Sequence, residues 1–161
     1  MTEIAHPPGP PRFHYARAAP GGYQAMLALE AFLHASGLEA ALIHLVKLRV
    51  SQINGCAFCI DMHWKDLRAG GETEQRLYSL DAWRECPWYT ERERAALLWA
   101  EAVTELADGH VSDEVYREVS GQFDEPSLAA LTFVVSTINA WNRLAIASRT
   151  APGTYQPRPK G

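Results

Sequence analysis

Apolar residues recur at helical spacing along most of this 161-residue chain, and this pattern restricts the fold more than any other sequence feature. No stretch alternates apolar and polar residues for long, and the single Asn-Gly pair lies between two helical patterns rather than between strand-like runs. We therefore expect an all-α protein. The expected helices cover residues 23–34, 38–53, 56–69, 72–80, 81–85, 90–106, 112–122 and 127–149.

Two of these predicted helices have clear signals at their ends. Gly55 ends the 38–53 helix because glycine readily adopts the left-handed backbone conformation of a helix end. Thr90 and Glu93 have the spacing of a capping box, which begins a helix. Since only a short turn separates the 38–53 helix from the 56–69 helix, we expect a helical hairpin within a compact multi-helix bundle.

The composition is that of a globular chain with one core. Hydrophobic residues make up 47% and charged residues 21%, and no apolar run approaches the roughly 18 residues of a membrane span. We expect a single domain over 1–161, with extended proline-rich tails at about 1–12 and 150–161. The first residues show no basic or apolar leader pattern, so we expect a cytoplasmic protein. The net charge of −4 argues against a nucleic acid or an anionic membrane as a partner.

The segment CAFCIDMH at 56–63 is the most informative part of the chain. On a helix, Cys59 lies about 60° and His63 about 20° from Cys56, so the three side chains share one face. Cys56 falls at the helix start, where free N–H groups and the helix dipole lower the pKa of a thiol from about 8.5 toward neutrality. The histidine can hold or pass on the released proton, and cysteines three residues apart can form a disulfide. The spacing indicates a redox site.

Two other interpretations of this segment remain open at this point. Its cysteines could be buried structural residues beside a surface histidine. They could also belong to a structural zinc site, which requires four ligands. Only Cys86 or His44 could complete such a site, and neither has zinc-finger spacing. Cys86 is expected to lie in a loop and to take no part in the chemistry of the redox pair.

Residues 45–63, LVKLRVSQINGCAFCIDMH, resemble the signature of the alkylhydroperoxidase D-like (AhpD-like) branch of the carboxymuconolactone decarboxylase family. The resemblance extends over roughly residues 13–149. Further stretches occur in the order found in the family: WRE at 83–85, YTERERAAL at 89–97, EAVT at 101–104 and INAWNR at 138–143.

This resemblance implies a fold, an activity and roles for individual residues. Members of the family are all-helical and commonly assemble as trimers or hexamers, so we expect a homo-oligomer. Redox-active members reduce hydroperoxides through the cysteine pair. By this resemblance Cys59 is the attacking thiolate, Cys56 resolves it as a disulfide, and His63 belongs to the proton relay. The substrate would be a hydroperoxide and the reductant an external dithiol or a lipoyl- or thioredoxin-like partner, with no metal, haem or flavin required.

The sequence departs from the family pattern at two positions. The family relay often includes a glutamate twelve residues before the first cysteine, and this chain has His44 there. Folding the hairpin about its Asn-Gly turn pairs His44 with Lys65, close to His63, so we expect His44 to assist the relay. An exposed, uninvolved position for His44 remains an alternative. The histidine between the two cysteines in the best-studied members is replaced here by Phe58.

Other polar residues in apolar segments are interpreted as structural. Glu101 could join the relay, but a solvated face or a structural hydrogen bond is the favoured interpretation. Asn139, Asn142 and Arg143 are interpreted as hydrogen-bonding groups between packed helices. The five tryptophans are expected in the core or at an interface.

The sequence therefore predicts an alkylhydroperoxidase-like oxidoreductase, a thiol-dependent peroxidase with peroxiredoxin activity. Two alternatives remain. One is a lactone decarboxylase of the same superfamily, although the resemblance implies that true decarboxylases do not depend on a cysteine pair. The other is a non-catalytic, redox-sensing oligomer whose cysteines only report the thiol state.

Overall fold

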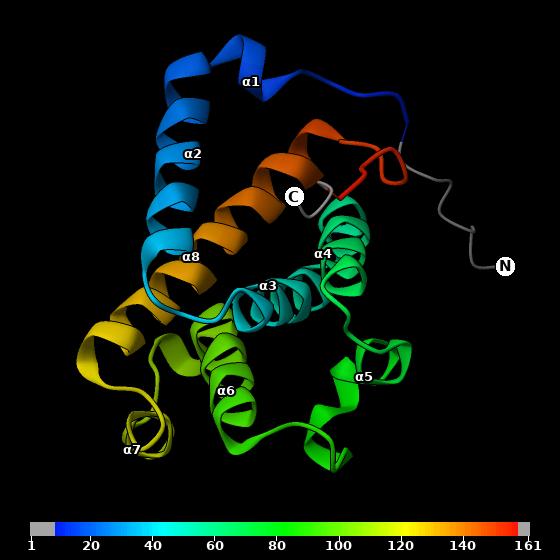
Figure 1. The fold of residues 1–161 in the computed structure, drawn as a ribbon. Coiled ribbons are helices and arrows are strands. Elements are labelled where there is room, and N and C mark those ends of the chain that lie inside the picture. Colours follow the sequence, from blue (N-terminus) through cyan, green and yellow to red (C-terminus); the bar gives the residue numbers. More distant parts are fainter. Residues whose placement is uncertain (1–8, 158–161) are drawn as a thin grey trace, which may run out of the picture.

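The computed structural model describes residues 9–157, and every regular element within this range is a helix. The predicted all-α fold is thus confirmed, and Figure 1 shows the order of the helices along the chain. The α-helices are α1 (Tyr15–Ala18), α2 (Pro20–Ala35), α3 (Ala40–Asn54), α4 (Ala57–Ala69), α5 (Glu74–Tyr78), α6 (Glu91–Glu105), α7 (Asp113–Ser120) and α8 (Glu125–Ser148). Two 3-10 helices, η1 (Leu80–Glu85) and η2 (Ala107–Gly109), precede and follow α6 along the chain.

Every predicted helix end lies within three residues of the observed one. The capping box is present at the start of α6, where the Thr90 side chain accepts from the Glu93 N–H and the Glu93 side chain accepts from the Thr90 N–H. Gly55 ends α3 with φ = 69°. Helices α1 and η2 were not predicted, because three or four residues are too few to show a helical repeat of apolar positions.

Helix α3 is the central element and packs against α4, α6 and α8. In Figure 1 it crosses the middle of the molecule, with α4 and α8 on one side and α6 on the other. One core cluster joins α3, α6 and α8, and a second joins α3 and α4 to the α5–η1 segment. None of the described helices combines the length and the apolar character needed to cross a membrane.

The described parts of the two tails contain no helix and lie on the body of the protein. The Arg12 N–H donates to the carbonyl oxygen of Ser148 at 3.0 Å. After α8 the chain passes over α4, where the Lys65 ammonium donates to the carbonyl oxygens of Gly153 and Tyr155. The outer parts of the predicted tails, residues 1–8 and 158–161, lie outside the described residues.

Candidate functional site

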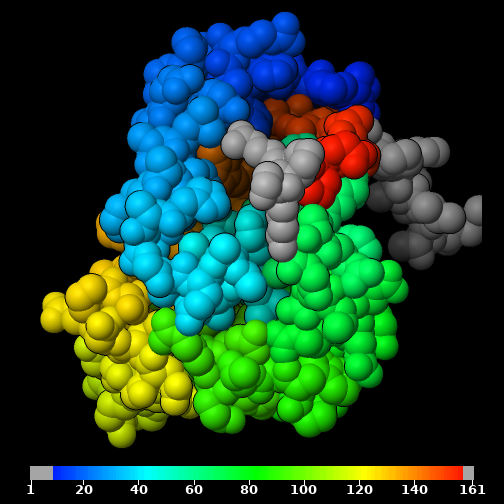
Figure 2. All heavy atoms as spheres, in the orientation of Figure 1, coloured from blue at the N-terminus to red at the C-terminus, as the bar shows by residue number. Residues whose placement is uncertain are grey.

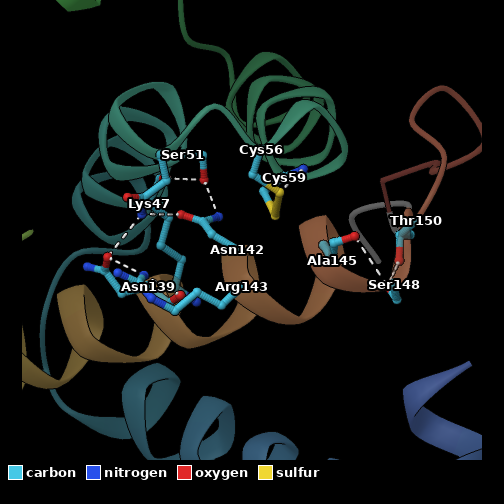
Figure 3. The surroundings of a disulfide bond; sticks show 11 residues. Lys47, Ser51, Cys56, Cys59, Asn139, Asn142, Arg143, Ala145, Ser148 and Thr150 are labelled. Atoms are coloured by element: carbon cyan, nitrogen blue, oxygen red, sulfur yellow. Dashed lines mark hydrogen bonds between the residues drawn. A yellow bond between two sulfur atoms is a disulfide. The ribbon is translucent and has the colours of Figure 1, made fainter. Parts of the chain in front are cut away.

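The two motif cysteines form a disulfide at the start of α4. Cys56 is the N-cap residue, and its sulfur accepts a hydrogen bond from the Cys59 N–H at 3.4 Å. The Cα atoms of the two cysteines are 5.4 Å apart, and each residue is 1% exposed. Figure 3 shows the disulfide directed from α4 toward α8. A sulfur at the N-terminal end of a helix faces unpaired N–H groups, which favour its anionic form.

A polar network fixes the turn that leads into the motif. The Asn54 amide donates to the side-chain oxygens of Asn139 and Asn142, both at 2.9 Å. Asn142 in turn donates to the Ser51 hydroxyl at 3.0 Å, as Figure 3 shows. These bonds tie the end of α3 to α8 across the core, so the predicted role of the two α8 asparagines in helix packing is confirmed. They hold the first cysteine in a fixed position relative to α8.

His63 follows Cys59 by one turn on α4 and meets His44 of α3. Their Nδ1 atoms are 3.2 Å apart, which is hydrogen-bonding distance. The predicted proximity of the two histidines is therefore confirmed, and His44 faces His63 directly. His63 is 4% exposed, whereas the side chain of His44 is 24% exposed.

Both histidines are favoured in their neutral form. Burial holds the pKa of His63 well below its usual value, and the positive charge of Lys47 and the neighbouring His44 act in the same direction. Burial also lowers the pKa of His44, an effect that the nearby Asp66 carboxylate opposes without reversing it. The Nε2 atom of His63 is buried and has no hydrogen-bond partner among the described residues. A neutral ring in this position can accept a proton.

The structure adds a carboxylate to the histidine pair. Asp66 lies three residues after His63 on α4, and its Oδ2 atom is 3.8 Å from the Nδ1 atom of His44. The other carboxylate oxygen accepts a hydrogen bond of 2.6 Å from the Tyr155 hydroxyl. Asp66 was not predicted as a site residue from the sequence, although its i+3 spacing from His63 places it on the same helix face. The contribution of Tyr155 depends on the path of the tail and has no local sequence signal.

A buried ion pair lies beside this cluster. The Lys47 ammonium is 2.5 Å from a carboxylate oxygen of Glu30, and the other oxygen accepts from the Trp141 indole N–H at 2.8 Å. Lys47 is 3% exposed, and burial lowers its pKa while Glu30 opposes the change. The sequence offered one signal for this group, a lysine inside an otherwise apolar helix face three residues after His44.

A cavity of about 310 Å³ opens between α2, α3, α4 and α8 next to these groups. Cys59 and His63 line it, whereas Cys56 does not. In Figure 2 the matching part of the surface is hollowed between α2 and the segment that follows α8, with atoms of α8 visible inside. Much of the wall is aromatic, and the Tyr23 and Trp141 ring centroids are 6.0 Å apart. The cavity therefore offers space for a small molecule, and Cys59 is the motif cysteine that borders it.

Two residues considered in the sequence analysis lie away from this cavity. Cys86 is 8% exposed in the second core cluster, and its thiol donates to the carbonyl oxygen of Ala82 at 3.4 Å. Glu101 is 7% exposed and is not among the cavity residues. Neither residue is positioned to react with a ligand beside Cys59.

Glu101 has a structural set of partners. It accepts from the Trp83 indole N–H at 2.8 Å and from the Arg49 guanidinium at 2.9 Å, and it forms an ion pair with Arg84 at 2.5 Å. Burial by itself would raise the pKa of Glu101, but these three hydrogen bonds outweigh it and lower the pKa. Of the two structural interpretations of Glu101, the hydrogen-bonded carboxylate is confirmed and the solvated face is wrong, because the residue is 7% exposed.

Comparison with known proteins places this chain in a family. The model of the carboxymuconolactone decarboxylase family matches residues 20–102. The uncharacterized protein YdfG of Bacillus subtilis (strain 168) is 44% identical over 136 residues, which are 84% of this chain and 92% of YdfG. The uncharacterized protein YnjA of Escherichia coli (strain K12) is 28% identical over 65% of this chain and 57% of YnjA.

Solved structures agree with this placement. The crystal structure of ATU0492 from Agrobacterium tumefaciens, a protein of unknown function proposed to be the antioxidant defence protein AhpD, has a TM-score of 0.86. It is 42% identical and covers 91% of this chain and 100% of its own. A peroxidase-related protein with an AhpD core from Ralstonia eutropha JMP134 shares the fold at 18% identity, with a TM-score of 0.76 over 86% of this chain and 74% of its own. The chain belongs to the carboxymuconolactone decarboxylase family and has the fold of its AhpD-like members.

Proposed function

We propose that this protein is a thiol-dependent peroxidase in which the Cys56–Cys59 pair is oxidised by a hydroperoxide and reduced again by an external dithiol. The observation that carries the proposal is that Cys59 is part of a disulfide and also lines a cavity beside a neutral, buried histidine. A structural disulfide needs neither a cavity nor a proton acceptor next to it.

The chemistry can be written with Cys59 as the reacting thiol. The Cys59 thiolate attacks one oxygen of ROOH, the O–O bond breaks, and the products are a Cys59 sulfenic acid and ROH after protonation. The Cys56 thiolate then attacks the Cys59 sulfur, which releases water and forms the disulfide. The pair loses two electrons and the peroxide gains them. This order of reaction agrees with the cavity, which is lined by Cys59 and not by Cys56.

The two histidines provide a path for the proton. His63 accepts the thiol proton at Nε2, the atom that has no other partner among the described residues. Its Nδ1 atom lies 3.2 Å from Nδ1 of His44, so a proton can pass from one ring to the other. His44 is more exposed and lies beside Asp66, so the proton can leave toward the cavity. The imidazole of His44 would do what a glutamate does elsewhere in the family.

The test is a peroxide-consumption assay with cumene hydroperoxide and a dithiol. Cys59→Ser should lower turnover by about tenfold or more, since a serine hydroxyl is a far weaker nucleophile than a thiolate. Cys86→Ser is the matched control, because this third cysteine lies in a separate core cluster. Mass mapping of the reduced protein should show free Cys56 and Cys59 thiols before peroxide is added and a Cys56–Cys59 disulfide afterwards. Full activity in Cys59→Ser would refute the proposal.

The wild-type protein and the Cys59→Ser variant also distinguish the two alternative functions. A lactone decarboxylase would release CO₂ from γ-carboxymuconolactone, and this activity should persist in Cys59→Ser. A redox sensor would form the disulfide once with peroxide, but no dithiol donor would support repeated turnover. Repeated turnover without CO₂ release supports the peroxidase.

A further inference from the structure

Three side chains beside the thiol pair are arranged as a set of metal ligands. The donor atoms of His44, His63 and Asp66 all lie within 4.8 Å of one another. His44 comes from α3, and the other two come from adjacent turns of α4. Two imidazoles and one carboxylate form the donor set that zinc and related divalent transition metals accept.

The distances approach those of a tetrahedral site. With zinc–nitrogen bonds of about 2.0–2.1 Å, two ligand atoms of a tetrahedron are about 3.3 Å apart. The Nδ1 atoms of His44 and His63 are 3.2 Å apart, close to this spacing. The Asp66 oxygen is 3.8 Å from the His44 nitrogen, and the three donor atoms lie within 4.8 Å of one another, so Asp66 must shift toward the two histidines to complete the set. The chain therefore needs little rearrangement to bind an ion here.

The charges around the cluster are mixed, with the Asp66 carboxylate within it and the Lys47 ammonium beside it. Among the described residues, Asp66 forms no direct ion pair with a lysine or an arginine, although its charge also acts on the Lys47 ammonium at longer range. The two nearby lysines are already paired: Lys47 with Glu30, and Lys65 with Asp61. Because each of these lysines has its own carboxylate partner, the Asp66 carboxylate remains available to bind an ion.

A second partner holds the carboxylate in place. The oxygen of Asp66 that does not face His44 accepts from the Tyr155 hydroxyl at 2.6 Å. Metal-binding carboxylates are commonly held in this way by a hydrogen bond to the oxygen that does not bind the ion. The cavity lies next to all three ligands, which leaves room for water at a fourth position.

We propose that His44, His63 and Asp66 form a binding site for a divalent transition-metal ion of the zinc type. The two Nδ1 atoms and one carboxylate oxygen bind the ion, and water or a small anion completes the coordination. Hard cations such as Mg²⁺ and Ca²⁺ bind poorly, because they prefer oxygen ligands. An ion bound to both Nδ1 atoms also interrupts the histidine–histidine contact that the proposed peroxidase uses.

The test is calorimetric titration of Zn²⁺ into the oxidised full-length protein, in which the motif sulfurs are joined and do not act as thiolate ligands. We expect one equivalent to bind in wild type, and Mg²⁺ not to compete. His44→Ala and Asp66→Asn should each weaken binding by about tenfold or more. His110→Ala is the control, since this histidine is exposed and lies outside the cluster.

The binding result does not depend on peroxidase activity, so the two proposals can fail separately. Circular dichroism establishes that each variant is folded, and if Asp66→Asn does not fold, His44→Ala decides the question. Cobalt added in place of zinc should give the visible absorption of a tetrahedral site in wild type and not in His44→Ala. Absence of binding up to about 1 mM Zn²⁺, or equal binding in wild type and His44→Ala, would overturn the proposal.

Discussion

His44 connects the buried half of the site to the exposed half, since it contacts His63 on one side and Asp66 on the other. His63 alone can accept a proton, but its ring is 4% exposed and cannot readily release it to water. In the proposed reaction the proton would therefore leave through His44. At the scale of the residue, the rate of the proposed reaction depends on this second imidazole.

Replacing His44 by alanine should lower peroxide turnover by about tenfold or more at neutral pH, because the proton on His63 loses its route out of the site. Steady-state assays with cumene hydroperoxide measure the effect, and titration of free thiols verifies that the cysteine pair is intact. His110→Ala serves as the surface control. Unchanged turnover in His44→Ala would show that His63 exchanges protons by another route.

Zinc should inhibit peroxide turnover if it binds the histidine pair. The expected result is inhibition that is reversed by a chelator and that is absent with Mg²⁺, because the ion and the proton compete for the same two nitrogen atoms. A dithiol that binds zinc weakly is required in this assay. Zinc binding without inhibition would separate the metal site from the relay.

Glu101 gives a stability prediction with a defined pH window. Its pKa is lowered in the folded state, so its contribution is complete above its ordinary value of 4.5 and is lost as the pH falls through the lower folded value. Glu101→Gln should therefore cost about 1–3 kcal/mol of unfolding free energy at pH 7, since it leaves Arg49 without its charged partner. Urea unfolding at pH 7 and pH 3.5 should show this difference shrinking at the lower pH. A difference independent of pH would contradict the assignment.

At the scale of the element, the α3–α4 hairpin determines the geometry of the site. Its two helices carry the cysteine pair, the histidine pair and Asp66, and the turn between them depends on one glycine. Gly55 has φ = 69°, a conformation that other residues adopt at a cost. Nothing lies within 4 Å of a Cβ atom added there, so this cost is conformational and not steric.

Gly55→Ala should lower the unfolding free energy by about 1–2 kcal/mol, because alanine disfavours the left-handed conformation. Gly21→Ala is the matched control: Gly21 lies in the first turn of α2 with equally open space and without positive φ. That variant should be neutral or more stable by up to about 1 kcal/mol. Urea unfolding of both variants measures the contrast, and equal effects would contradict this explanation of the turn.

At the scale of the whole molecule, α2 and α8 expose apolar side chains on a shared face. Phe32 is 47% and Phe133 is 50% exposed, and their rings pack edge to face with centroids 5.7 Å apart. Large apolar groups gathered on a surface commonly mark a contact with another protein chain. Together with the expectation of a homo-oligomer, this face is where we propose that copies of the chain meet.

Sedimentation at micromolar concentration should show a trimer or a hexamer, and Phe133→Asp should shift the protein to a smaller species. The charge would have to be buried without a partner in the assembled form. Tyr78→Ser is the control, because Tyr78 is 71% exposed on a different helix, α5. A stable wild-type monomer would refute the assembly.

Local sequence patterns were enough to predict the helices, the hairpin and the position of the cysteine pair. These features depend on local spacing: apolar positions at helical intervals, a glycine at the turn, and CxxC followed by a histidine one turn later. Even the contact between His44 and His63 could be predicted, because a short turn leaves two adjacent helices only one simple way to pair.

The surroundings of the cysteine pair depend on contacts between residues far apart in the sequence. Tyr155 reaches Asp66 from a tail 89 residues away, and Trp141 reaches Glu30 across 111 residues. No local pattern contains such contacts, because they depend on how α2, α8 and the tail pack over the hairpin. The same packing buries His63 and thereby lowers its pKa, so the charge state of the site is a property of the assembled core and not of the motif.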